Sequence, residues 1–286
     1  MLSRLCFFIL TAAVFVPASA EEIRIAASDL LADFISAPLQ AYGEEQAIEF
    51  KIDNIGSLPA LERLRADEID MAIIAVPANT EVPREEFRAY PFAYDVAVVA
   101  VNDGNPLDKV SIGALGGIFG SNEEFNYNSW GELDLSGWGH RTIKPLAAVI
   151  DNSISLELFK FSVLSAGQMK ASVVAVKDSE VEGLLISDAS SIAILSRLPK
   201  SKKIKALMIS SESNGPAFGP TDENVHYGDY PIRLAFHIVY NERNHATVDK
   251  VLPILFSDEI AKALRLNHLF ALPDTVRRQL TSSLVK

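Results

Sequence analysis

The sequence predicts an α/β protein built from two lobes. Short apolar runs alternate with amphipathic segments along the whole chain, a pattern typical of strands that alternate with helices. The chain has 286 residues, and removing the 20-residue leader described below leaves 266 (286 − 20), a length that favours two lobes over one core. Apolar residues make up 49% of the chain and no low-complexity run occurs, which excludes a disordered protein.

The N-terminus has the features of a cleaved secretory signal peptide over residues 1–20. Arg4 precedes an apolar run over residues 5–16, and Ala18-Ser19-Ala20 supplies a small-residue cleavage site. A membrane anchor is the alternative, but the run is shorter than the ~20 apolar residues that a spanning helix needs. The only cysteine, Cys6, lies inside this leader. We therefore expect a periplasmic protein whose mature chain has no disulfide, thiol nucleophile or cysteine metal ligand.

The charge balance excludes several classes of partner. The chain has 26 Lys and Arg against 37 Asp and Glu, so the mature chain without Arg4 carries 25 − 37 = −12. Such a chain is not expected to bind nucleic acid or an anionic membrane surface by general electrostatics. The five histidines show no metal-binding spacing, and the G-x-S-x-G nucleophile motif is absent. We expect no metal, no cofactor and no enzymatic activity.

The first lobe is expected to begin with strands that alternate with helices. Leu30, Leu31 and Phe34 recur at helical spacing and predict a helix between the first two strands, and residues 58–66 predict a second helix. The expected strands are Ile23–Ala27, Ile48–Ile52, Met71–Val76 and Val96–Val101, the last of which leaves the lobe.

The second lobe is expected to repeat this alternation, and the chain then returns to the first lobe. Helices are expected around residues 112–119 and over residues 156–164, and further ones over residues 246–256 and 258–266 finish the first lobe. The expected strands are Leu146–Ile150, Val173–Val176, Ile192–Leu195, Ala206–Ser210 and the returning Ile232–Val239. This order predicts discontinuous lobes: residues 21–97 and 231–286 form the first lobe, and residues 98–230 form the second.

Small or polar residues stand where three of the expected helices begin. Such junctions lie at the carboxyl ends of the strands in an open α/β sheet, beside the cleft. Helix N-termini offer unpaired N–H groups and partial positive charge, so convergent N-termini suit an oxyanion, although serine also caps helices in the absence of a ligand. The candidate ligand-binding residues are Ser28, Asp29, Gly56, Ser57, Asp151, Asn152, Ser153 and Ser155.

Two blocks of sequence stand out near the expected crossing and in the second lobe. One covers residues 115–133, and the other contains Pro220, Thr221, Glu223, Asn224, Gly228, Tyr230 and Pro231. Both resemble segments of the PstS-like, phosphate-binding periplasmic solute-binding proteins, whose returning crossing reads roughly PT-x-E-N-I-x-x-G-x-Y-P-L and whose earlier segment reads G-x-x-I-F-x-G…I-x-x-W. The resemblance implies a type II periplasmic-binding-protein fold, with two crossing segments and a cleft between the lobes. It also implies a monomer that delivers phosphate to an ABC permease in the inner membrane.

The ligand motifs of the family are only partly kept. The family's R-x-D-G-S-G-T junction aligns on Asp151, which puts Ser153 and Ser155 at its Ser and Thr positions. The family's arginine position is Val149, and the aspartate of its S-D-A-P motif is Ala75. Burying a dianion without a compensating cation costs several kcal/mol, so these two changes predict weak phosphate binding unless another cation replaces the arginine. The conceivable replacements are Lys51, Arg141, Lys144 and Arg233.

Two functions therefore stay open from the sequence. One is a solute-binding protein of an ABC importer that holds phosphate or a similar oxyanion. The other is a binding or sensing module of the same fold that does not bind phosphate and recognises another ligand or an envelope protein.

Overall fold

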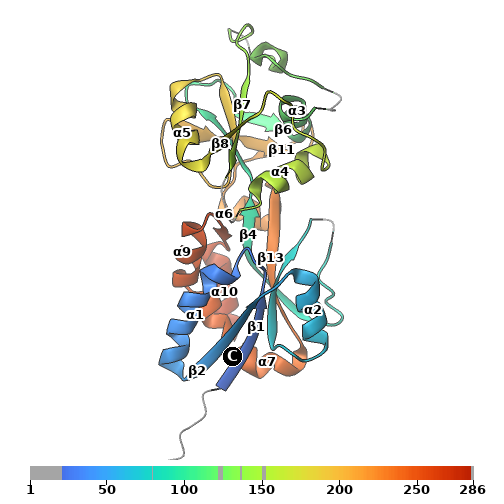
Figure 1. Ribbon diagram of the computed structural model, residues 1–286, viewed down its shortest axis with the longest axis vertical. Coiled ribbons are helices and arrows are strands. Elements are labelled where there is room, and N and C mark those ends of the chain that lie inside the picture. The colour runs from blue at the N-terminus through green and yellow to red at the C-terminus, as the bar shows by residue number, and fades with distance from the viewer. Residues whose placement is uncertain (1–20, 79, 122–124, 136, 150–152, 285–286) are drawn as a thin grey trace, which may run out of the picture.

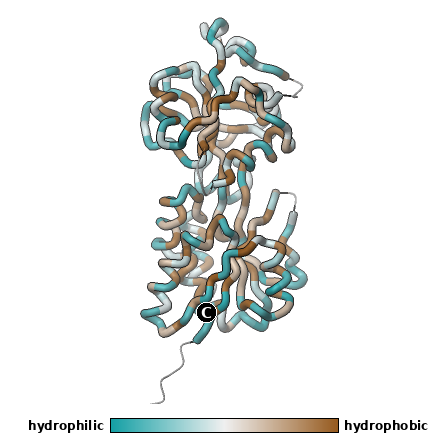
Figure 2. The backbone as a smooth tube through the Cα atoms, in the orientation of Figure 1, coloured by the Kyte–Doolittle hydropathy of each residue, from teal (hydrophilic) through white to brown (hydrophobic). Residues whose placement is uncertain are grey.

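The protein consists of two lobes stacked along its long axis (Figure 1). The computed structural model describes residues 21–78, 80–121, 125–135, 137–149 and 153–284. Each lobe is built on its own β-sheet, and hydrophobic residues are concentrated along the strands of both sheets (Figure 2).

The first lobe is a six-stranded mixed sheet in the order β14-β4-β13-β3-β1-β2. β1 lies between β2 and β3 and is parallel to both, whereas β13 is antiparallel to its neighbours β3 and β4. The strands are β1 (Glu21–Ala27), β2 (Ile48–Asn54), β3 (Met71–Val76), β4 (Arg88–Val96), β13 (Arg233–Tyr240) and β14 (Phe270–Ala271).

Helices cover both faces of this sheet because its central strands carry buried apolar side chains on both faces. Ile23 and Ile25 on β1 pack with Ile35 of α1 in one core cluster. On the other face, Ala26 packs with Leu64 of α2. The helices of this lobe are α1 (Ala32–Gln46), α2 (Ser57–Arg65), α7 (His245–Val248), α8 (Leu252–Leu255), α9 (Asp258–Leu266) and α10 (Asp274–Leu284), with a 3-10 turn η2 (Glu242–Asn244).

The second lobe has a five-stranded sheet in the order β10-β5-β9-β7-β8 and a small sheet in the order β12-β11-β6. Its strands are β5 (Val98–Asn102), β6 (Lys109–Ser111), β7 (Lys144–Val149), β8 (Val174–Lys177), β9 (Ser191–Leu195), β10 (Ile204–Ala206), β11 (Met208–Ser210) and β12 (Ala217–Phe218). Its helices are α3 (Ile112–Phe119), η1 (Trp130–Leu133), α4 (Ser155–Leu164) and α5 (Asp178–Ser187).

Two chain segments cross between the lobes and are hydrogen-bonded to each other. The outgoing segment passes from β4 to β5 through Ala97, and the returning segment runs from α6 (Asp222–Tyr227) into β13. The buried Tyr230 hydroxyl donates to the Ala97 carbonyl at 2.9 Å, and the Ala97 N–H donates to the Ile232 carbonyl at 3.2 Å. Among the described residues, no helix is long and apolar enough to cross a membrane. The lobe boundaries at residues 97/98 and 230/231 stay a prediction.

Several elements differ from the expectation. The strand expected at Val96–Val101 is the junction of β4 and β5, which belong to different sheets. The strand expected at Ala206–Ser210 is likewise split, because β10 pairs with β5 whereas β11 pairs with β6. The helix expected at residues 246–256 is broken into α7 and α8, with Pro253 in the first turn of α8, where a missing N–H is tolerated.

Candidate functional site

The first two predicted junctions lie side by side at one edge of the first sheet. The Ser28 N–H donates to the Ile73 carbonyl at 3.0 Å, and the Ile55 N–H donates to the Ala27 carbonyl at 3.1 Å. Ser57 accepts a hydrogen bond from the Ala75 N–H at 2.9 Å, which ties the start of α2 to the end of β3. The structure thus brings the two junctions close to Ala75, the position where the related family has its aspartate.

The predicted residues at this edge differ in exposure. Ser28 is buried, and its carbonyl accepts the N–H groups of Leu31 and Ala32 at 2.8 and 3.0 Å, which begins the turn into α1. Its hydroxyl faces the neighbouring Asp29 carboxylate at 3.3 Å, while Asp29 itself is exposed. Gly56 is exposed at the N-cap of α2. Neither α1 nor α2 has a side-chain cap, so N–H groups of their first turns carry no such partner.

The third junction lies in the second lobe, between β7 and α4. The Ser153 hydroxyl accepts the Ser155 N–H at 3.2 Å and contacts the Ser155 hydroxyl at 3.2 Å, and Ser155 is buried. The other two residues predicted at this junction, Asp151 and Asn152, lie outside the described residues. Val149, at the end of β7, has 49% of its surface exposed and occupies the position of the family's arginine.

A cavity of about 260 Å³ joins this junction to the first lobe. It is bounded by Pro77 and Ala78 after β3, by the start and one side of α4, and by the first residues of β13. The third junction therefore faces the end of β3 across the space between the lobes. This cavity is the candidate ligand site.

A buried carboxylate, Asp95, lies at the end of β4 next to the start of α4. Its side chain is 2% exposed and accepts the Val96 N–H at 2.8 Å. Burial raises the pKa of Asp95 to about 6, and the backbone N–H groups of Val96 and Ile154 partly oppose this rise. Because Ile154 is the N-cap of α4, Asp95 links a strand of the first lobe to a helix of the second.

One arginine, Arg233, lines the cavity. Its Nη1 donates to the carbonyls of Val225 and His226 at 2.8 and 3.3 Å, at the C-terminal end of α6. The guanidinium carbon also lies 5.2 Å from the centroid of the Tyr94 ring. These contacts hold Arg233 in a fixed orientation at the crossing. No carboxylate in the described part of the chain pairs with it.

The other three cations considered from the sequence are engaged elsewhere. Lys51 pairs with Glu22 at 2.5 Å on the edge strand β2. Lys144 pairs with Asp188 at 2.5 Å at the start of β7. Arg141 packs over the Trp138 ring at 4.2 Å. None of these three lines the cavity between the lobes.

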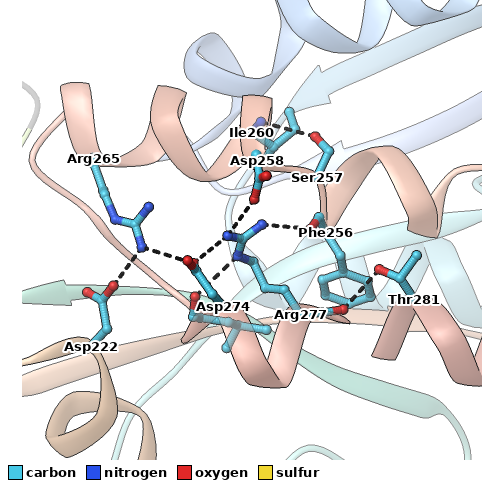
Figure 3. Close-up of polar contacts among 10 residues, drawn as sticks. Asp222, Phe256, Ser257, Asp258, Ile260, Arg265, Asp274, Arg277 and Thr281 are labelled. Carbon is cyan, nitrogen blue, oxygen red and sulfur yellow. Dashed lines mark hydrogen bonds and ion pairs between the residues drawn. The ribbon is translucent and has the colours of Figure 1, made fainter. Parts of the chain in front are cut away.

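A larger cavity of about 770 Å³ lies between α6, the segment after β9 and the C-terminal helices. The two arginines that line it already have carboxylate partners. Arg265 contacts Asp222 at 2.6 Å and Asp274 at 3.8 Å, as the close-up shows (Figure 3). Arg197 contacts Asp178 and Glu182 at 3.3 and 2.5 Å. Size alone therefore does not make this cavity the ligand site. None of the predicted site residues that the structure describes lines either cavity, and the smaller one is preferred because it lies between the start of α4 and the end of β3.

Comparison with known proteins places this two-lobed architecture in a family. A family model for the PBP superfamily domain matches residues 16–260. The chain belongs to the PBP superfamily. The fold is the two-lobed type II fold of the periplasmic binding proteins, as the sequence predicts.

Within the PBP superfamily, the chain is similar to three proteins in particular. Protein SphX from Synechococcus elongatus is 26% identical over 199 residues, which cover 66% of this chain and 58% of SphX. A structure described as a possible phosphate binding protein from Planctomyces limnophilus has a TM-score of 0.70 at 16% identity, covering 94% of this chain and 99% of that one. An ABC-type phosphate transport receptor from Vibrio cholerae has a TM-score of 0.57 at 16% identity, covering 88% and 100%. The two solved structures are described as a binding protein and a receptor, not as enzymes.

The structure draws attention to two residues at or beside the candidate site. Asp95 is not predicted from the sequence, because no pattern there marks a carboxylate that will be buried. Arg233, one of the conceivable replacement cations, both supports the crossing and lines the cavity. The motif Gly228-x-Tyr230 identifies the crossing, but not the direction in which the following arginine points. No cluster of His, Cys, Asp or Glu suited to a metal ion occurs among the described residues.

Proposed function

We propose that this protein is a periplasmic solute-binding component of an ABC importer that holds a small oxyanion between its lobes. One observation supports this proposal most directly. The start of α4 in the second lobe, the segment after β3 and Arg233 line the same cavity. In a hinged protein of this fold, a ligand in that cavity contacts both lobes and favours the closed arrangement, which a permease can distinguish from the open one.

Helix N-termini supply the electrostatic part of the proposal. The N-cap residues of α1, α2 and α4 provide no side-chain cap, although the Ser153 hydroxyl accepts the first N–H of α4, whereas α3, α6 and α9 are capped by Ser111, Thr221 and Ser257. Each N-terminus stabilises an anion by roughly 0.3–1 kcal/mol when exposed, and by up to ~2 kcal/mol when partly buried. Ser28, Ser57, Ser153 and Ser155 are proposed as hydroxyl donors beside these N-termini.

The small number of cations at the cavity limits the affinity for phosphate. Desolvating a dianion costs several kcal/mol, and Arg233 is the one cation that lines the cavity in the described part of the chain. Ala75 offers no carboxylate to accept the proton of hydrogen phosphate. We therefore expect phosphate binding weaker than micromolar.

A binding or sensing module with a different ligand is the second candidate, and the exposed Val149 favours it. This apolar side chain stands where the related family has a ligand-pairing arginine. In that case the partner is another envelope protein or a permease for a different solute.

Calorimetric titration tests the proposal. The mature protein is unfolded and refolded to remove carried-over ligand, and it is then titrated with phosphate and sulfate while scattering measures its compactness and its expected monomeric mass. Saturable binding of an anion together with a more compact particle supports a solute-binding role. If the folded protein neither binds nor compacts with any anion, the proposal is wrong.

A double variant separates the two candidates. Val149→Arg with Ala75→Asp restores the two family residues, and each single substitution serves as its control. Micromolar phosphate binding in the double variant alone would show a competent scaffold whose natural ligand differs. Micromolar phosphate binding by the unaltered protein would eliminate the second candidate.

A further inference from the structure

The wall of the inter-lobe cavity is mostly apolar. Of the nine described residues that line it, three are polar: Glu157, Ser162 and Arg233. Inorganic oxyanions are recognised through donors and cations, so an apolar wall contributes nothing to their binding. The six apolar residues are Pro77, Ala78, Ile154, Leu158, Phe161 and Leu234.

A large apolar side chain of this cavity is also exposed to water. Phe161, which lines the cavity from α4, has 55% of its surface exposed. Covering such a surface is favourable in proportion to the apolar area removed from water, and exposed apolar patches commonly mark ligand-binding grooves.

The charges at the cavity indicate a single negative charge on the ligand. Glu157 is paired with Lys160 at 2.7 Å, so these two side chains neutralise each other. Arg233 is held by two backbone carbonyls and has no carboxylate partner in the described part of the chain. One uncompensated cation matches a monoanion better than a phosphate dianion, because the second negative charge would be buried without a partner.

We propose that the ligand of this cleft is a small organic monoanion with a short apolar body. Its acid group, a carboxylate or sulfonate, contacts Arg233, and its apolar part lies against Leu158 and Phe161. The volume of about 260 Å³ is just below the ~300–1,000 Å³ of typical ligand pockets and limits the body to a short chain or one ring. This inference rests on the solute-binding role proposed above and specifies its ligand class.

A homologous series of acids tests the ligand class. The refolded mature protein is titrated calorimetrically with acetate, butyrate, hexanoate and hexanesulfonate, and with phosphate, sulfate and hexanol as comparison ligands. We expect the affinity to rise by about fourfold per added CH₂, or more than about 100-fold from acetate to hexanoate, from the ~0.8 kcal/mol of each buried CH₂. Hexanesulfonate should bind like hexanoate, whereas the uncharged hexanol should bind at least tenfold more weakly, since a hydrogen-bonded charge contributes roughly 1.5–3 kcal/mol.

A variant tests whether the apolar wall of the cavity causes the increase in affinity along the acid series. Phe161→Ala should reduce the increment in affinity per CH₂, and it should fold because the side chain is half exposed. Phe125→Ala is the matched control, since Phe125 has 49% of its surface exposed and lies outside the cavity. It should leave the whole series unchanged.

The outcomes separate this inference from the solute-binding role. Micromolar phosphate or sulfate binding with no gain along the acid series overturns the organic ligand and leaves the solute-binding role intact. If the affinity of Phe161→Ala rises along the acid series as much as that of the unaltered protein, the ligand's apolar part does not lie against Phe161. Absence of binding by every ligand, from protein shown to be folded, overturns both proposals.

Discussion

Replacing the buried Asp95 by asparagine should change how stability depends on pH. Burial raises the pKa of this carboxyl from its ordinary 3.8 to about 6. Between these two values the unfolded chain loses the proton while the folded protein keeps it, so the free energy of unfolding falls as pH rises. The shift of about two pKa units corresponds to ~3 kcal/mol, which is fully lost above pH ~6. Asp95→Asn keeps the size and the acceptor for the Val96 N–H but cannot ionise.

Urea unfolding followed by circular dichroism between pH 4 and pH 8 measures this effect. The quantity of interest is the free energy of unfolding of Asp95→Asn minus that of the unaltered protein, because other titrating groups cancel in this difference. We expect it to increase by ~3 kcal/mol from about pH 4 to about pH 7. Asp103→Asn, at an exposed aspartate in the second lobe, is the control and should give a much smaller change. A difference for Asp95→Asn that is flat or that decreases with pH would refute the reasoning.

Three further predictions concern the crossing and its surroundings. His237 is half-buried, its Nδ1 is buried without a hydrogen-bond partner, and burial, followed by the nearby Arg84, Arg233 and His226, lowers its pKa to about 4. Stability from this residue is present above pH ~6.5 and is lost towards pH ~4, because the unfolded chain gains a proton there before the folded protein does. The free energy of unfolding of His237→Phe minus that of the unaltered protein should therefore rise by ~3 kcal/mol on acidification. The same urea series measures it. Tyr230→Phe leaves the buried Ala97 carbonyl without its donor and should cost about 1–3 kcal/mol in chemical denaturation, whereas a cost near zero would mean that water replaces the hydroxyl. Gly228→Ala should cost at least about 1 kcal/mol by thermal melting, because φ is +89° there and an added Cβ would lie 2.8 Å from Arg233 Nη2; a neutral result would show that the guanidinium moves aside.

The sequence predicts best those elements whose burial is local and continuous. Met71–Val76 is an unbroken apolar run between Asp70 and Pro77, and its predicted bounds are those of β3. α9 is equally clear, because Ser257 caps a strongly amphipathic segment. By contrast, α5 was not predicted, because Gly183 interrupts it and only Val181 and Leu185 are buried.

The candidate site is harder to predict because its contacts are distant in sequence. Helix starts at residues 28–29 and 56–57 can be recognised from local polar residues. The hydrogen bond from the Ala75 N–H to the Ser57 hydroxyl joins residues 18 positions apart, and no hydrophobic periodicity in the sequence predicts it. The raised pKa of Asp95 depends on segments from both lobes, and the position of Arg233 in the cavity depends on the carbonyls of a preceding helix. The sequence pattern therefore identifies the sheet edges that we propose as the ligand site, while packing decides which charges lie there.

The pairing of the two crossings has a consequence for how the molecule can deform. Two independent tethers would let the lobes twist as well as bend, but Tyr230 and Ala97 bond the outgoing chain to the returning one. The crossings thus act as a ribbon, which bends across its flat face more easily than within its plane. An insertion in one crossing alone would shift its partners out of register and tilt one lobe against the other. Length changes here should therefore be tolerated only when both crossings change together.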